Sequence, residues 1–288
     1  MKSFGGRVAA ITGAGSGMGR TLALSLARRS CHLALSDVNE LGLAETAKLA
    51  ATHGVKITSK KVDVSQRAQV YAWADEVVAD HGKCNLIINN AGVAHSATLE
   101  GTSYEDFEWI MGINFWGVVY GTKAFLPHLR ASGEGHVVNL SSLFGLVSVP
   151  GNGTYNATKF AVRGFTEALR EELEVTRAPV SATCIHPGGI KTNIARSARM
   201  HGSVKDLGID DPVAAQRGFE KAFRVTAEQA AETILRGVQR NARRVLIGTD
   251  AKALDALQRL LPSGYQRIFV AGARRTIANI GAKRNGRV

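Results

Sequence analysis

Tyr155 and Lys159 are the two residues of this sequence whose types and spacing are best suited to chemistry. Side chains four positions apart in a helix lie on the same face, so the phenol and the ammonium would be neighbours. A neighbouring cation favours the phenolate, and we expect it to lower the pKa of Tyr155 from about 10 toward neutrality. A tyrosine with such a pKa can exchange a proton with an alcohol oxygen, so the pair predicts acid–base chemistry.

Two further features accompany this pair. Ser142 follows the apolar run of residues 137–140 and lies thirteen positions before Tyr155. A glycine-rich turn over residues 12–19 follows the first apolar run, and glycines there allow the backbone to approach a pyrophosphate with no Cβ in the way. A helix that begins near Gly17 would direct free N–H groups and its positive end at the phosphates.

Together these motifs resemble the short-chain dehydrogenase/reductase family, whose members move a hydride between a nicotinamide and an alcohol or ketone. The resemblance spans about residues 5–250. It implies that Tyr155 is the acid/base, that Lys159 lowers its pKa and holds the nicotinamide ribose, and that Ser142 hydrogen-bonds the substrate oxygen. Asn114 matches the fourth catalytic member of the family, and it would hold a water that links Lys159 to solvent.

The resemblance also implies a dinucleotide site at the carboxyl ends of the strands, where ligands bind in such sheets. Asp63 and Val64 would lie at the adenine, and the Ile190 backbone and Thr192 hydroxyl would hold the nicotinamide carboxamide. The predicted cofactor-binding residues are Gly13, Ser16, Gly17, Met18, Gly19, Asp37, Asp63, Val64, Asn90, Ala91, Gly92, Tyr155, Lys159, Pro187, Gly188, Ile190 and Thr192.

Asp37 predicts which dinucleotide is used. It ends the second predicted strand, eighteen residues after Gly19, where a carboxylate accepts both adenosine ribose hydroxyls and repels a 2′-phosphate. Positions at which the family's NADP users carry a basic residue hold Ser16 and Val38 in this chain. We therefore predict NAD, with an ordinary capping role for Asp37 as the alternative.

The elements that position these residues follow from short apolar runs that alternate with amphipathic segments. We predict strands over residues 8–12, 32–36, 57–62, 86–89, 136–140, 180–186 and 244–248. We predict helices over residues 17–29, 40–52, 65–81, 103–131 and 155–175. This alternation predicts an α/β fold with a doubly wound parallel sheet, the Rossmann fold, in a single domain over residues 1–248.

The substrate pocket is predicted from the loops that flank the catalytic residues: His95, Leu143, Phe144, Val149 and Asn152. An exposed loop position is the alternative for His95. The apolar members of this set favour a substrate with an apolar body. Residues 189–225 form a connection of the length of a lid, with Gly202, Gly208 and Pro212 in it. Its basic residues could meet an anionic group, although a solvated face is the default interpretation: Lys191, Arg196, Arg199 and Lys205.

Residues 249–288 extend beyond the family core and are basic. The chain carries a net charge of +12, and residues 236–288 contain twelve Lys/Arg and only two Asp/Glu. Because the rest is nearly neutral, we do not expect nucleic-acid binding. Two apolar helical stripes in the extension, separated by Pro262, predict helices packed on the subunit or on a partner. Peripheral contact with an acidic membrane surface and guidance of an acidic substrate carrier remain alternatives.

Composition limits the remaining function classes. Three scattered cysteines at predicted buried positions indicate reduced core thiols, and we predict no metal site. No apolar stretch reaches the roughly 18 residues of a membrane span, and the N-terminal apolar run is too short for a signal peptide. We therefore expect a cytoplasmic protein that forms a homodimer or homotetramer.

The sequence predicts an oxidoreductase that transfers a hydride between NAD(H) and a secondary alcohol or ketone. A ketone or 3-oxoacyl-thioester reductase that uses NADPH is the alternative within the same class. A non-catalytic nucleotide-sensing or membrane-docked module is the alternative from another class.

Overall fold

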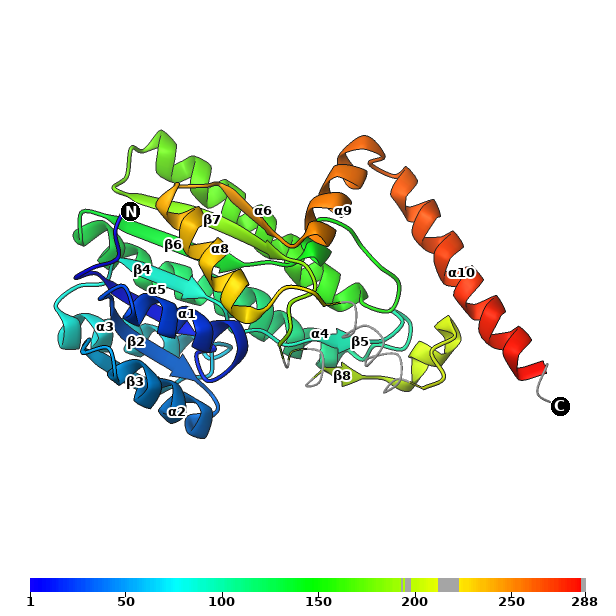
Figure 1. Ribbon diagram of the computed structural model, residues 1–288, viewed down its shortest axis with the longest axis horizontal. Helices are drawn as coiled ribbons and strands as arrows, with labels where there is room; N and C mark the ends of the chain where they lie inside the picture. Colours follow the sequence, from blue (N-terminus) through cyan, green and yellow to red (C-terminus); the bar gives the residue numbers. More distant parts are fainter. Residues whose placement is uncertain (193, 195–197, 212–222, 286–288) are drawn as a thin grey trace.

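The protein is described from a computed structural model, which gives the backbone of residues 1–192, 194, 198–211 and 223–285, and the side chains among these up to residue 275. A seven-stranded sheet forms its centre, with the strand order β3-β2-β1-β4-β6-β7-β9 and parallel pairing throughout (Figure 1). The strands are β1 Val8–Thr12, β2 His32–Asp37, β3 Ile57–Lys61, β4 Leu86–Asn89, β6 Gly135–Leu140, β7 Val180–Pro187 and β9 Arg244–Ile247.

Helices cover both faces of the sheet (Figure 1). Their bounds are α1 Gly17–Ala27, α2 Glu40–Ala51, α3 Arg67–His81, α4 Tyr104–Met111, α5 Gly117–Ala131, α6 Gly153–Val175, α8 Ala227–Gln239, α9 Thr249–Leu260 and α10 Gly264–Asn285. Alternate residues of β1 point to opposite faces, so Ile11 packs in the core with α1 and α8, and Ala10 packs in the core with α3, α5 and α6. The predicted doubly wound Rossmann fold is confirmed.

The predicted strands agree with the observed ones to within a residue or two at their ends. The main difference lies in residues 103–131, where one helix was predicted. The chain instead forms α4 and α5 joined by a π-helical turn, η1, over Gly112–Trp116. Two further features were not predicted: helix α8 and a small parallel sheet of β5 (His95–Ser96) and β8 (Arg199–Met200).

The C-terminal extension forms α9 and α10, one for each predicted apolar stripe. The side chain of Tyr265 in α10 is buried beside Leu143 and Val147, and Phe269 packs against the same cluster. Beyond this contact α10 projects away from the sheet (Figure 1). The packing of its first turns favours the interpretation of the extension as helices packed on the subunit.

All three cysteines are buried in the core of the protein. Burial raises the pKa of Cys31, Cys84 and Cys184 to about 12, so all three stay protonated at neutral pH. All three are unbridged, as expected for core thiols. Within the described part of the chain, no helix is both long and apolar enough to cross a bilayer.

Candidate active site

Ser142 lies just beyond the carboxyl end of β6, where it caps the 3-10 turn η2 (Leu143–Gly145). The backbone N–H of Phe144 donates to Ser142 Oγ at 3.1 Å. A hydroxyl has one proton and two lone pairs, so an Oγ that accepts from the backbone keeps its own proton to donate. The turn therefore orients the Ser142 hydroxyl so that it can donate a hydrogen bond.

Tyr155 is presented by the first turn of α6, close enough to the Ser142 side chain for that hydroxyl to favour the phenolate. Its ring also packs edge-on against Phe144, with 6.2 Å between the ring centroids. Burial raises the pKa of Tyr155, and the Ser142 hydroxyl opposes this rise. The direction is opposite to the one expected from the Tyr-Lys spacing, because the loss of hydration of the phenolate outweighs the other effects.

Lys159 lies one helical turn after Tyr155, as predicted. Its Nζ is 5.6 Å from the centroid of the Tyr155 ring and donates to the Leu140 carbonyl oxygen at 3.0 Å. Burial lowers the pKa of Lys159 to about 8. The ammonium is therefore buried beside the phenol and its charge is sensitive to pH near neutrality.

Asn114 is fully buried within the π-helical turn η1. Its Oδ1 accepts from Val93 N at 2.8 Å, and its Nδ2 donates to Val93 O at 2.9 Å. A Cβ added to Gly92 would lie 3.2 Å from Asn114 Oδ1 and 3.5 Å from Lys159 Nζ, so these three residues are brought together. The water-holding role of Asn114 remains a prediction, and the bonds to Val93 show that its side chain also fixes the loop after β4.

The glycine-rich turn forms a close-packed cradle between β1 and α1. Gly13 has a φ of +65°, and a Cβ added there would lie 2.8 Å from Ala91 Cα. A Cβ on Gly19 would lie 2.0 Å from the Gly13 carbonyl oxygen, so this position accepts only glycine. Ser16 has an extended backbone, and its side chain makes no capping hydrogen bond to the first turn of α1. Met18 in that turn is half-buried. The N-terminus of α1 is therefore available to a phosphate.

Asp37 reaches this cradle from the end of β2. Its Oδ2 accepts from Gly15 N at 2.8 Å and its Oδ1 accepts from Asn39 N at 2.9 Å. A carboxylate has about four lone-pair sites, so two backbone bonds leave acceptor capacity on both oxygens. The arrangement fits a pair of ribose hydroxyls.

The predicted cofactor residues in the loops after β3 and β4 include polar side chains that bind neighbouring backbone. Asn90 Nδ2 donates to the carbonyl oxygens of Thr12 and Gly13, which ties the loops after β4 and β1 together. Asp63 Oδ1 accepts from Ser65 N and Oγ, so this carboxylate orders the turn before α3. Val64 is buried.

The residues predicted for the nicotinamide end follow β7. Thr192 approaches the cradle, since a Cβ added to Gly17 would lie 3.5 Å from Thr192 Cβ. Ile190 is buried and forms an isolated parallel bridge with Val225. Pro187 and Gly188 begin this loop, and its next residue, Gly189, donates its N–H to Asp250 Oδ2 at 2.7 Å.

Asp250 and His186 are the residues near the site that the sequence analysis missed. Asp250 belongs to the first turn of α9, and His186 is buried with Nδ1 2.9 Å from the Ser142 carbonyl oxygen. The only available signal was position, because His186 comes directly before the Pro-Gly motif and Asp250 comes shortly after the last predicted strand.

The five predicted pocket residues take different places. Phe144 packs edge-on against Tyr155, whereas Leu143 belongs to the cluster with α9 and α10. His95 is 1% exposed, which rules out the exposed-loop alternative, and its Nδ1 is 2.9 Å from Thr154 Oγ1. Val149 lines an apolar groove of about 600 Å³ beside α10, and Asn152 Oδ1 accepts from Ser96 Oγ.

The described part of the predicted lid is fixed to the body at β8. Arg199 stacks on the Trp109 ring at 3.6 Å and forms an ion pair with Asp106. This pairing accounts for Arg199 without an anionic substrate. Lys191 and Lys205 are exposed. Arg196 and Pro212 lie outside the described residues.

The arrangement combines a glycine-lined cradle at a helix N-terminus with two hydroxyl groups, those of Ser142 and Tyr155. The glycine positions, the free helix end and the unused acceptor capacity of Asp37 fit a nicotinamide dinucleotide. Ser142 and Tyr155 fit an oxygen atom that changes between hydroxyl and carbonyl. Among the described residues, no cluster of His, Cys, Asp and Glu could hold a metal ion.

Comparisons with known proteins agree with this geometry. The sequence model of the family described as "short chain dehydrogenase" matches residues 7–202. The Mycobacterium tuberculosis protein named "Putative oxidoreductase SadH" is 52% identical over 272 residues, which cover 94% of this chain and 97% of that protein. Human "Estradiol 17-beta-dehydrogenase 11" is 31% identical over 93% of this chain and 83% of its own length.

Solved structures show the same fold. A short-chain dehydrogenase/reductase from Burkholderia phymatum in complex with NAD superposes with a TM-score of 0.82 at 32% identity, over 91% of this chain and 95% of that one. Levodione reductase superposes with a TM-score of 0.75 at 27% identity, over 88% of this chain and 99% of that one. From the sequence match, the shared fold and the geometry of the site, the chain belongs to the short-chain dehydrogenase/reductase family of oxidoreductases.

Proposed function

We propose that the protein is an NAD-dependent dehydrogenase of secondary alcohols, with the corresponding ketones as products. The observation that carries this proposal is the placement of Ser142 and Tyr155 beside the buried Lys159 ammonium, at the same sheet edge as the glycine cradle. A bound nicotinamide would supply the acceptor for the hydride that leaves the carbinol carbon.

The protein residues would handle the proton and the charge on oxygen. Tyr155, as phenolate, takes the hydroxyl proton while the C–H bond breaks, and in the reverse direction the phenol returns it to the carbonyl oxygen. Ser142 donates a hydrogen bond to the same oxygen and stabilises the charge that develops there. Lys159 holds the nicotinamide ribose and favours the phenolate once that site is filled, and Asn114 relays the proton to solvent through a water.

The proposed preference for NAD over NADP rests on Asp37. One of its oxygens already accepts from Gly15 N of the glycine cradle, and a 2′-phosphate there would meet a carboxylate in place of a cation. The Burkholderia phymatum relative, whose structure is a complex with NAD, supports the same preference.

The proposed substrate is an alcohol with an apolar body. Phe144 packs edge-on against the reacting tyrosine, and Val149 lines an apolar groove. The human relative is named for estradiol, which is a secondary alcohol on an apolar body. The alternative, a ketone or 3-oxoacyl-thioester reductase that uses NADPH, is weakened by Asp37, and a non-catalytic module is weakened by the complete set of four catalytic side chains.

We also propose a homodimer or homotetramer in the cytoplasm, with α5 and α6 at the interface. Trp116, at the entry to α5, and Phe160 on α6 are 46% and 37% exposed, which supports a covered surface there. Light scattering of the purified chain measures this mass directly.

The first test is turnover of a panel of secondary alcohols and 3-hydroxyacyl thioesters with NAD and, separately, NADP. Apolar alcohols with NAD are expected to be oxidised fastest. Activity confined to thioesters with NADP would move the assignment to an acyl reductase.

Tyr155→Phe tests the mechanism within that activity. Because the phenylalanine ring fills the same space and cannot transfer a proton, turnover should fall by roughly 1,000-fold or more while NADH still binds. The matched control is Tyr71→Phe, which changes an exposed tyrosine of α3 and should leave turnover unchanged. Retained turnover in Tyr155→Phe would contradict the proposed role.

A further inference from the structure

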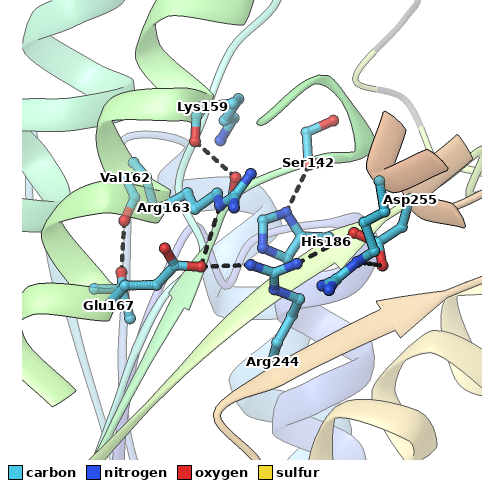
Figure 2. Close-up of polar contacts among 11 residues, drawn as sticks. Ser142, Lys159, Val162, Arg163, Glu167, His186, Arg244 and Asp255 are labelled. Atoms are coloured by element: carbon cyan, nitrogen blue, oxygen red, sulfur yellow. Dashed lines mark hydrogen bonds and ion pairs between the residues drawn. The ribbon is translucent and has the colours of Figure 1, made fainter. Parts of the chain in front are cut away.

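His186 occupies a buried position directly behind Ser142. It precedes Pro187 at the end of β7, and its side chain is fully buried. The ring Nδ1 lies 2.9 Å from the Ser142 carbonyl oxygen (Figure 2). Since a carbonyl oxygen only accepts hydrogen bonds, Nδ1 must carry the proton and donate it.

This bond completes the set that fixes Ser142. Gly145 N donates to the same carbonyl at 2.9 Å, and Phe144 N donates to Ser142 Oγ at 3.1 Å. The peptide of Ser142 is thus held from the sheet by His186 and from the following turn by Gly145. Its side chain is held separately, which leaves the hydroxyl proton for Tyr155 or for a substrate oxygen.

A chain of charged groups surrounds the other side of the imidazole (Figure 2). Glu167 of α6 pairs with Arg163 at 3.1 Å and with Arg244 of β9 at 2.6 Å, and Arg244 also pairs with Asp255 of α9 at 3.1 Å. Nε2 of His186 is buried and has no hydrogen-bond partner among the described residues.

These surroundings keep the imidazole neutral. Burial lowers the pKa of His186 to about 4, and the two guanidinium groups of Arg244 and Arg163 act in the same direction, against the Ser142 carbonyl and Glu167. A proton on Nε2 would place a third cation beside the two arginines. The Nδ1–H tautomer is therefore retained throughout the neutral range.

We propose that His186 is a positioning residue: its Nδ1–H holds the Ser142 peptide so that the Ser142 hydroxyl meets the reacting oxygen. The inference rests on the proposed function, which makes Ser142 the donor to that oxygen. His186 acts through Ser142 and is one residue away from the Pro-Gly loop of the cofactor site. A donor displaced by about 1 Å can cost on the order of 100-fold in rate, so the anchor matters even though it is not a reacting group.

Three substitutions at His186 distinguish the effect of the position of the N–H donor from the effect of the bulk of the imidazole ring. His186→Asn keeps an N–H donor near the place of Nδ1, His186→Gln moves the donor toward the place of Nε2, and His186→Leu removes it. With the best alcohol of the panel, kcat should stay within about threefold of wild type for Asn and fall roughly 10- to 100-fold for Gln and Leu. The KM for NAD should change little in all three, because no cofactor contact is lost.

A second readout does not depend on turnover. The ultraviolet absorbance of the Tyr155 phenolate, taken as the difference between each His186 variant and the same variant with Tyr155→Phe, reports the placement of the Ser142 hydroxyl beside Tyr155. Because that hydroxyl lowers the pKa of Tyr155, its displacement in the Gln and Leu variants should shift the phenolate titration to higher pH, and Asn should not.

The outcomes are distinct. A wild-type protein that oxidises no alcohol and reduces no ketone overturns the proposed function, while the phenolate titration still tests His186. Folded Gln and Leu variants with wild-type kcat and wild-type titration overturn the role of His186 alone. If the Leu variant does not fold, the comparison of Asn with Gln decides. An equal loss of kcat in the Asn and Gln variants would overturn the positioning role of His186, since it would show that the place of the donor does not matter.

Discussion

At the scale of single residues, the site depends on how each polar atom divides its bonds between the backbone and a ligand. Ser142 accepts from the backbone and keeps its proton, and Asp37 accepts twice from the backbone and keeps acceptor capacity on both oxygens. Lys159 is buried and Tyr155 is half-buried. Loss of hydration lowers the pKa of Lys159 and raises the pKa of Tyr155, which favours the neutral form of each side chain. At neutral pH the free protein therefore carries Tyr155 as the neutral phenol, whereas most of Lys159 is still the ammonium.

Asp37→Ala is a prediction at this scale. Loss of the carboxylate removes two charge-assisted bonds to ribose, so the KM for NAD should rise on the order of 10- to 100-fold with a smaller change in kcat. The preference for NAD over NADP should shrink, because the repulsion of a 2′-phosphate is lost as well. Initial-rate kinetics with both cofactors check this, and Asp80→Ala on the exposed face of α3 is the control. An unchanged KM for NAD would assign Asp37 to local capping.

At the scale of elements, the C-terminal extension contributes to the site through α9 as well as α10. The carboxylate of Asp250 lies so close to two glycines that a Cβ on Gly188 or Gly248 would come within 2.2 or 2.3 Å of its Oδ1. The bond from Gly189 N to Asp250 joins the loop after β7 to the start of α9. The loop predicted to hold the nicotinamide is therefore tied to a helix outside the family core.

Asp250→Ala tests this connection. Without the acceptor the loop after β7 loses an anchor, so we expect the KM for NAD to rise about three- to tenfold and Tm to fall by a few degrees. Asp250→Asn retains a side-chain carbonyl oxygen that can accept from Gly189 N, and it should recover most of the loss. Steady-state kinetics and thermal unfolding measure the two effects. Wild-type kinetics in the alanine variant would show that the loop holds its shape without α9.

At the scale of the whole molecule, buried histidines couple stability to pH. His136 in the middle of the sheet and His186 at its edge are both fully buried, and burial lowers their pKa values to about 3 and about 4. In the unfolded chain a histidine has a pKa of about 6.5, so the unfolded state binds protons first as the pH falls. The stabilisation that comes from keeping these two imidazoles neutral is complete above about pH 6.5 and is lost progressively toward pH 4.

We therefore expect the free energy of unfolding to drop by roughly 2 kcal/mol for each of these imidazoles between pH 6.5 and pH 5. Urea unfolding at the two pH values measures the drop. His186→Asn should reduce it by about half of the histidine contribution, whereas His53→Asn at an exposed position should not change it. An equal drop in wild type and His186→Asn would show that the imidazole gains no extra proton on unfolding.

Much of this protein was determined by local sequence. Alternating apolar runs and amphipathic segments fixed the order of strands and helices, because burial on two faces of a sheet leaves a periodic pattern. The cradle was equally predictable, since Gly13 and Gly19 stand where a Cβ would collide with neighbouring backbone. The helical spacing of Tyr155 and Lys159 places them together whatever surrounds α6.

Other features were decided only by tertiary structure, since they depend on residues far apart in the chain. Burial reversed the expected direction of the Tyr155 pKa, and desolvation cannot be inferred from a spacing of four residues. The π-helical turn contains Asn114, whose two hydrogen bonds to the Val93 backbone join residues 21 positions apart, a contact that no local propensity predicts. His186 became a partner of Ser142 because β6 and β7 pair side by side, which brings the ends of two strands together across 44 residues of sequence.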